Sequence, residues 1–144
     1  MPDKQTYANH TRWYPFVHFI IVPLLLLNFI YQAVRLYQEP SWDRAVFLAF
    51  CLVVLLAVPA ARLQALKAQD RLIRLEERLR YDELLSAELA AQASGLNVEN
   101  VIALRFAPDG ELSSLVERTL AGEFAKPKDI KIAIKEWRGD YLRV

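Results

Sequence analysis

Two uncharged apolar runs in the first half of the chain predict its class. The first run covers residues 13–34 and the second 45–61, with only residues 35–44 between them. At ~1.5 Å rise per residue, each run is long enough, or nearly so, to cross the ~30 Å hydrocarbon layer of a membrane. The short connection predicts an antiparallel transmembrane hairpin, with spans at about 14–36 and 43–61. Two core helices of a soluble protein are the disfavoured alternative, because 144 residues could hardly bury both on all sides.

Lysine and arginine near the ends of the runs predict the orientation. Six such residues lie within 62–80, directly after the second run, whereas the loop carries only Arg35 and Arg44. The positive-inside rule therefore places the segment after the hairpin, and with it both termini, in the cytoplasm. Aromatic residues suited to anchoring at the membrane interface flank the first run and the loop: Trp13, Tyr14, Phe16, Tyr31, Tyr37 and Trp42.

Three residues interrupt the apolar character of the first run. Pro23 cannot donate its backbone hydrogen bond, which predicts a kink. Asn28 is expected to contact another helix, either the second span or a partner protein. His18 fits an axial ligand of a haem or chlorin, a proton relay, or an interfacial histidine bonded to a backbone carbonyl or a lipid headgroup. We favour the last interpretation, because the chain has no second intramembrane histidine.

A charged amphipathic helix over 62–94 is predicted to continue the second span and to end at Gly95. Its apolar positions alternate at spacings of three and four, but Asp82 ends the pattern after about two heptads. That length is too short for a self-standing coiled coil. We expect the stripe to pack against the C-terminal helices of the same chain, with docking on a partner as the alternative; its positions are Ala65, Ala68, Leu72, Leu75 and Leu79.

The region 95–144 is predicted to be small and helical. Asn97 is a candidate N-cap for a helix to about residue 105, and the sequence Pro-Asp-Gly at 108–110 indicates a turn. A second helix ends near Gly122, and a third follows Pro127 with Ile130, Ala133, Ile134 and Trp137 on one face. Segments 101–107 and 130–134 are alternatively strands, because β-branched residues are frequent there. About fifty residues form a marginal core, so we expect this region to need the long helix, lipid or a partner.

The N-terminal sequence QTYANHTR at 5–12, followed by Pro15, His18 and Pro23, resembles the opening of an uncharacterised bacterial family of small two-span membrane proteins. Further similar phrases are ALKAQDR at 65–71, RLE at 74–76, ALRFA at 103–107, DIK at 129–131, Trp137 and DYLRV at 140–144. The resemblance covers almost the whole chain. It implies a bacterial inner-membrane protein, two spans and a helical cytosolic tail, and it brings no activity.

Candidate chemistry is sparse. The region 62–144 carries 14 Lys and Arg against 14 Asp and Glu, so we do not expect nucleic acid as a partner. Cys51 is the only cysteine, which excludes a disulfide within the chain and a cysteine metal site. No phosphate-binding loop, zinc motif or nucleophile elbow is present. The acidic pairs at 76–77 and 82–83 are expected to lie on a solvated helix face.

These observations predict an all-α, non-enzymatic protein without a metal, acting as an accessory or scaffolding subunit of a larger membrane complex. Respiratory and photosynthetic assemblies are the analogy. The expected contacts are membrane lipids and other integral membrane subunits, made by His18, Asn28, Trp13 and Tyr14, by the three leucines of the stripe and by Trp137. The alternative is a membrane-tethered adaptor whose cytosolic tail recruits a soluble regulator. Homo-oligomerisation stays open in both cases.

Overall fold

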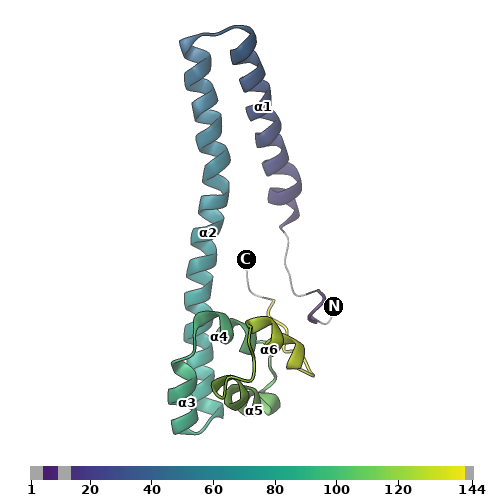
Figure 1. Ribbon diagram of the computed structural model, residues 1–144, viewed down its shortest axis with the longest axis vertical. Helices are drawn as coiled ribbons and strands as arrows, with labels where there is room; N and C mark the ends of the chain where they lie inside the picture. Colours follow the sequence, from purple (N-terminus) through teal and green to yellow (C-terminus); the bar gives the residue numbers. More distant parts are fainter. Residues whose placement is uncertain (1–4, 10–13, 142–144) are drawn as a thin grey trace. The chain divides into compact units, whose positions relative to one another are not determined.

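The protein is all-helical, as predicted. The computed structural model describes residues 5–9 and 14–141, and in these ranges there is no strand, so segments 101–107 and 130–134 contain helix and turn. The chain divides into a hairpin unit, residues 12–66, and a helical unit, residues 67–144 together with 1–11. The elements are a π-helix η1 (Phe16–Ile21), then α1 (Val22–Gln38), α2 (Trp42–Leu84), α3 (Ala87–Ser94), α4 (Val98–Leu104), α5 (Asp109–Leu120) and α6 (Pro127–Ala133) (Figure 1).

The hairpin unit consists of two antiparallel helices that run side by side (Figure 1). The helix Phe16–Gln38 and the apolar part of α2 are both long and apolar enough to cross a membrane, and none of the most apolar window of either is buried. The first expected span, 14–36, coincides with the helix Phe16–Gln38 to within two residues, and the second, 43–61, lies inside α2.

The first apolar helix opens with the π-helix, directly before Pro23. The Val22 amide donates to the carbonyl of Val17, five residues back, which closes a wider turn than an α-helix has. Proline cannot donate to the preceding turn, and its ring crowds the carbonyl four residues before it. The expected irregularity at Pro23 thus takes the form of a π-helical segment.

A small ion cluster closes the loop of the hairpin. The Arg44 guanidinium donates to the backbone carbonyls of Glu39 at 2.8 Å and Arg35 at 3.2 Å, and it also binds the Glu39 carboxylate. The Arg35 side chain lies 3.3 Å from the same carboxylate. Hydrogen bonding and the positive charge of Arg44 hold the pKa of Glu39 below its usual range. Both arginines of the loop are therefore paired with one acidic side chain.

Helix α2 ends ten residues earlier than predicted, at Leu84 rather than at 94. Ser86 adopts an extended backbone conformation, and its hydroxyl accepts a hydrogen bond from the Leu89 amide at 3.3 Å. This N-cap begins the separate helix α3, because the capped turn cannot also continue α2. Helix α3 ends at Gly95, where the sequence predicted a helix end.

The helical unit closes its own apolar core. Asn97 caps α4 as predicted, and its side chain accepts from the Asn100 amide at 2.8 Å. The last helix, α6, ends at Ala133, so the prediction that Trp137 lies on its face is wrong. Trp137 instead follows the helix and stacks on Phe106, with ring centroids 4.7 Å apart. The core residues are Tyr81, Ala90, Ala93, Ala103, Leu104, Phe106, Ala107, Leu112, Leu115, Val116, Ile130 and Ile134.

The stripe expected to pack on the C-terminal helices does not do so. Leu72, Leu75 and Leu79 are 55%, 56% and 59% exposed. The face of α2 that is buried in the helical unit carries Ile73, Glu77, Arg80 and Tyr81 instead. The buried face of a helix is the one whose side chains have complementary groups on neighbouring elements. Here Glu77 and Arg80 have such partners in Arg138 and Asp109.

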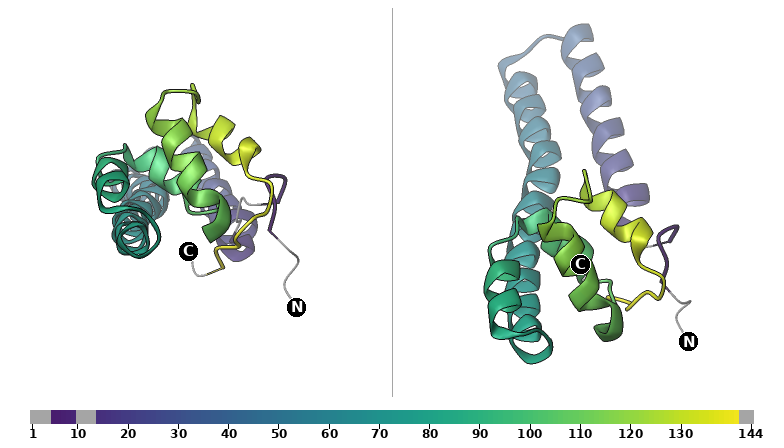
Figure 2. Two further views of the ribbon diagram at one scale, coloured as in Figure 1. Left: turned by 90° about the horizontal axis from the view of Figure 1, so that it is seen from below. Right: turned by 60° about the horizontal axis from the view of Figure 1, so that its bottom comes forward.

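Of the N-terminal arm expected over residues 1–12, the structure describes residues 5–9, which belong to the helical unit; residues 1–4 and 10–12 lie outside the described residues. The Asp140 amide donates to the Gln5 side-chain oxygen at 2.8 Å. The Tyr7 ring meets the Trp137 ring edge to face, at 6.5 Å between centroids. Figure 2 shows this N-terminal segment beside the residues that follow α6. The two ends of the described chain are therefore in contact.

Candidate functional site

Six charged side chains, here called the charge network, gather in the helical unit. Ion pairs join Glu77, Arg80, Asp109 and Arg138, and a neighbouring pair consists of Arg105 and Asp140. Glu77, Arg80 and Arg105 are 4%, 8% and 7% exposed. Buried charges are costly unless they are paired and hydrogen-bonded. Each of the three buried charges has a partner of opposite sign: Glu77 pairs with Arg80 and Arg138, and Arg105 pairs with Asp140.

Arg80 is the centre of the network. Its guanidinium donates to the Glu77 carboxylate at 3.1 Å and to one Asp109 oxygen at 2.6 Å and 3.0 Å. It also donates to the backbone carbonyl of Ala107 at 2.8 Å. One side chain thereby ties α2 to the turn before α5 and to the first residue of α5. The planar guanidinium suits this task because its donors point in fixed directions.

The remaining two arginines attach the C-terminal tail. Arg138 donates to the second oxygen of Glu77 at 3.4 Å, and its backbone amide donates to the carbonyl of Phe106 at 2.8 Å. Arg105 forms an ion pair with Asp140 at 3.1 Å and lies over the Phe106 ring, 4.4 Å from its centroid. The tail after α6 is therefore held by charge and by aromatic contact.

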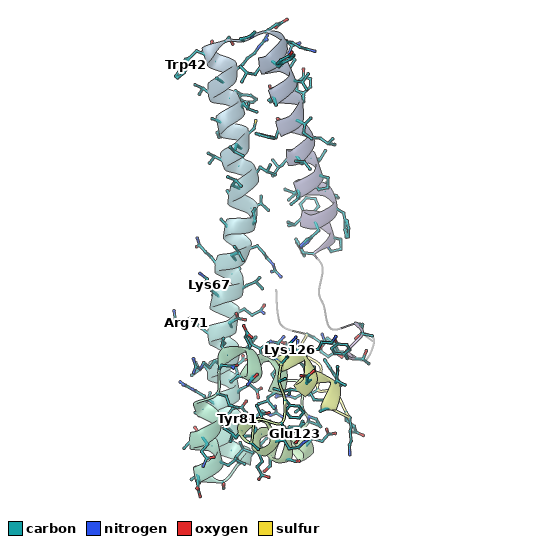
Figure 3. All side chains as sticks on the ribbon, in the orientation of Figure 1. Trp42, Lys67, Arg71, Tyr81, Glu123 and Lys126 are labelled. Carbon is teal, nitrogen blue, oxygen red and sulfur yellow. The ribbon has the colours of Figure 1, made fainter. Side chains whose placement is uncertain are left out.

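Burial changes the acidity of two groups on this face of α2. Desolvation raises the pKa of Glu77, although the positive charges of Arg80, Arg138 and Arg105 oppose the shift. Burial also raises the pKa of Tyr81 strongly. Among the described residues, no group donates to or accepts from the Tyr81 hydroxyl. Figure 3 shows Tyr81 on the side of α2 that faces the other helices of the helical unit.

A cleft of about 590 Å³ opens beside the charge network. Its lining carries acidic and basic groups, together with Tyr141, and no histidine, cysteine or serine. Arg138, with 51% of its side chain exposed, presents a cation to this cleft. The arrangement can bind a charged or polar group. The lining residues are Ile73, Glu76, Glu77, Leu79, Arg80, Glu83, Arg105, Arg138, Gly139, Asp140 and Tyr141.

The residues predicted for the first span belong to the hairpin unit and not to this site. The His18 ring nitrogen Nδ1 lies 2.9 Å from the carbonyl of Tyr14, as expected for a histidine bonded to its own backbone. The Cys51 thiol donates to the Asn28 side-chain oxygen at 3.4 Å, so the predicted interhelix contact of Asn28 is made with the second helix. Tyr14 is 57% exposed, and Trp13 lies outside the described residues.

Sequence reasoning missed the charge network. Glu77 was expected on a solvated face, but it is buried, whereas Glu76, Asp82 and Glu83 are exposed as expected. The available signal was the spacing of Ile73, Glu77, Arg80 and Tyr81, which places all four on one helix face. Among residues 5–9 and 14–141, no group of three or more His, Cys, Asp and Glu could hold a metal ion.

The fold and the site define an all-helical protein with an apolar hairpin and a compact, charge-tethered helical unit. The chain belongs to the family of unknown function DUF6526, whose model matches residues 1–144. Comparison with curated proteins gives no match, and comparison with solved structures gives none.

Proposed function

We propose that this chain is a non-enzymatic, membrane-anchored adaptor. In this proposal the hairpin unit crosses the bacterial cytoplasmic membrane twice, and the helical unit binds a soluble partner at its cleft. The observation that carries the proposal is the charge network, which holds the exposed cation of Arg138 in place through the buried carboxylate of Glu77. Fixed charges lose little freedom on binding, so they suit recognition of a complementary surface.

Exposed apolar side chains support membrane anchoring. Phe19, Leu24, Leu27 and Val53 are each more than 60% exposed in the hairpin unit. Contiguous apolar surface of this extent is unfavourable in water and marks a site covered by lipid or protein. The polar groups inside the hairpin have internal contacts, as the Cys51–Asn28 hydrogen bond illustrates, which suits a hydrocarbon environment.

The contact between the chain ends supports the topology. Gln5 and Asp140 are hydrogen-bonded, and two crossings would return the chain to the side on which it began. Lysine and arginine are what the positive-inside rule counts, and six of them lie within residues 62–80 against Arg35 and Arg44 in the loop. The positive-inside rule then favours a cytoplasmic helical unit.

A second candidate is the accessory subunit of a larger membrane complex, bound through the hairpin. The observation that favours it is the exposure of Ala49, Ala57, Ala60 and Ala61 on α2. Small residues let helices approach closely in a membrane, where van der Waals packing drives association. The closed core of the helical unit does not support this candidate, because that unit needs no partner to complete its packing.

A chimaera experiment separates the two candidates. Residues 14–66 are replaced by an unrelated two-span hairpin, and tagged chains are compared by native electrophoresis with mass spectrometry after mild solubilisation. The adaptor proposal expects the same partner with the original and the replaced hairpin. Loss of the partner on replacement of the hairpin would favour the accessory subunit.

The cleft is tested with two charge-neutralising variants in the full chain. Arg138→Gln keeps a donor for Glu77 but removes the exposed charge, and we expect roughly tenfold weaker partner binding. Lys128→Gln is the matched control, since Lys128 is exposed on α6 and does not line the cleft. Equal binding by both variants would contradict a role for the cleft.

A further inference from the structure

The exposed leucines of α2 form a surface that the helical unit leaves uncovered. Leu72, Leu75 and Leu79, the leucine stripe, are each more than half exposed. Ile73 and Tyr81 are buried on the other side of the same helix. Figure 3 shows Arg71, next to the stripe, on the side of α2 away from α4, α5 and α6. The chain therefore uses one face of this helix for its own core and leaves a second apolar face exposed.

The spacing of the stripe is that of a coiled-coil seam. With Leu72 and Leu79 at position a, Ala68 and Leu75 fall at position d. Asp82 is the next d position, and it ends the seam. Three large apolar side chains at spacings of three and four suit a partner helix that presents the same pattern.

The charged residues beside the seam match those of a second copy of this chain in a parallel orientation. Arg71 and Arg78 occupy position g, and Glu76 and Glu83 occupy position e. In two parallel helices in register, each g residue faces the e residue five positions later on the other chain. Arg71 would face Glu76, and Arg78 would face Glu83, on both sides of the seam. An antiparallel pair would place arginine opposite arginine and glutamate opposite glutamate.

We propose that two copies of this chain associate through the leucine stripe as a short parallel coiled coil over residues 68–83. Arg71, Glu76 and Glu83 are exposed. Glu76, Glu83 and Leu79 also line the edge of the cleft, so the dimer seam borders the partner site. Arg78 donates from one nitrogen to the Ser94 carbonyl at 3.3 Å, and a guanidinium has further donors for a glutamate.

The parallel arrangement rests on the membrane anchoring proposed above. Two chains anchored in one membrane must run the same way, and their confinement raises the effective concentration of each helix near the other. The higher effective concentration thereby compensates for the weak association of a coiled coil that is only two heptads long. The match between the charged residues at positions g and e follows from the sequence of α2 and does not require membrane anchoring.

Cysteine cross-linking of the full chain tests the seam. In a Cys51→Ser background, Leu72→Cys and Leu79→Cys should each give disulfide-linked dimers on mild oxidation in membranes. Lys67→Cys is the matched control, exposed on α2 but outside the seam, and we expect at least about tenfold less dimer. Equal linking at Lys67→Cys, or linking of the two leucine positions only to each other, would overturn the parallel seam.

Charge exchange tests whether the partner is a second copy of this chain. Recovery of dimers in a mixture of two variants shows that each variant is folded. Arg71→Glu and Glu76→Arg should each weaken self-association by about tenfold in detergent, because like charges then face each other. A mixture of the two variants should restore dimers, since every cross-chain pair is again of opposite sign. Failure of the mixture to exceed either variant would overturn the proposed pairing. Failure of the adaptor proposal would appear separately in Arg138→Gln, which changes the cleft but lies outside the seam: partner binding would be unchanged and the dimer normal.

Discussion

Arg80 donates hydrogen bonds to Ala107 and Asp109, outside its own helix, and its removal has a definite expected cost. Arg80→Ala leaves Glu77 buried with only the longer contact to Arg138, at 3.4 Å. Removing one member of a buried ion pair typically costs about 3 kcal/mol or more, because the remaining charge stays desolvated. We expect the free energy of unfolding to fall by about 3 kcal/mol.

Guanidinium unfolding of the full chain in detergent measures this change. Trp137 fluorescence reports on the helical unit when Trp13 and Trp42 are replaced by phenylalanine. Lys67→Ala is the control, since Lys67 is exposed on the same helix and its loss should cost within about 0.5 kcal/mol. Similar losses for the two variants would show that the buried contacts of Arg80 are not what stabilises the unit.

Glu77 gives a prediction about pH. Its pKa is raised above the ordinary value of 4.5 by burial, so the folded chain holds this proton to higher pH than the unfolded chain does. The stability that the raised pKa of Glu77 contributes to the folded chain is therefore full below pH 4.5, and it is lost as pH rises through the folded-state pKa.

Comparison with Glu77→Gln isolates the pH dependence of stability that comes from Glu77, because glutamine at this position does not take up a proton. The stability of the original chain relative to the variant should decrease as pH rises from 4.5 and then stay constant. Unfolding curves at closely spaced pH values measure the difference. An increase with pH would mean that the neighbouring arginines outweigh desolvation.

At the scale of elements, Glu111 joins the first turn of α5 to the segment after α6. Its carboxylate accepts hydrogen bonds from the amides of Lys135 at 3.1 Å and Glu136 at 3.2 Å. Glu111→Ala leaves both amides without this acceptor, and we expect a loss of roughly 1–3 kcal/mol. Hydrogen exchange at these two amides should accelerate, whereas Glu117→Ala, exposed on the same helix, should leave their exchange unchanged.

Local signals in the sequence predicted the helices better than their packing. Asn97 and Gly95 marked helix ends correctly, because a cap depends on its immediate neighbours. Ser86 is also a cap, but leucine and alanine on both sides of it favour helix, so the end of α2 was missed.

The choice of packing face could not be made from local pattern. Three leucines indicate a buried stripe, whereas the buried face of α2 carries Glu77 and Arg80. Those charges are buried because Arg138 and Asp109, distant in the sequence, complete their pairing. Burial of a charge depends on its neighbours in space, and one sequence does not display them. For the same reason the cleft was not predicted, while the Asn28 contact across the hairpin was.

At the scale of the whole molecule, the proposed topology predicts a labelling pattern. In a Cys51→Ser background, Asn9→Cys and Ala125→Cys, both at exposed positions, should react with a membrane-impermeant maleimide from the same side of sealed vesicles. Gln38→Cys, at the end of α1, should react only from the opposite side. Reaction of all three from one side would contradict two crossings, and inverted vesicles provide the control for orientation.

The meeting of residues 5–9 with residues 137–140 has a consequence for biosynthesis. Tyr7 leaves the ribosome about 130 residues before Trp137 does, which at about 5–20 residues per second is a delay on the order of ten seconds. Both apolar helices are synthesised within that interval. Residues 5–9 can meet residues 137–140 only after that interval, so under the proposed topology insertion of the hairpin precedes formation of this contact.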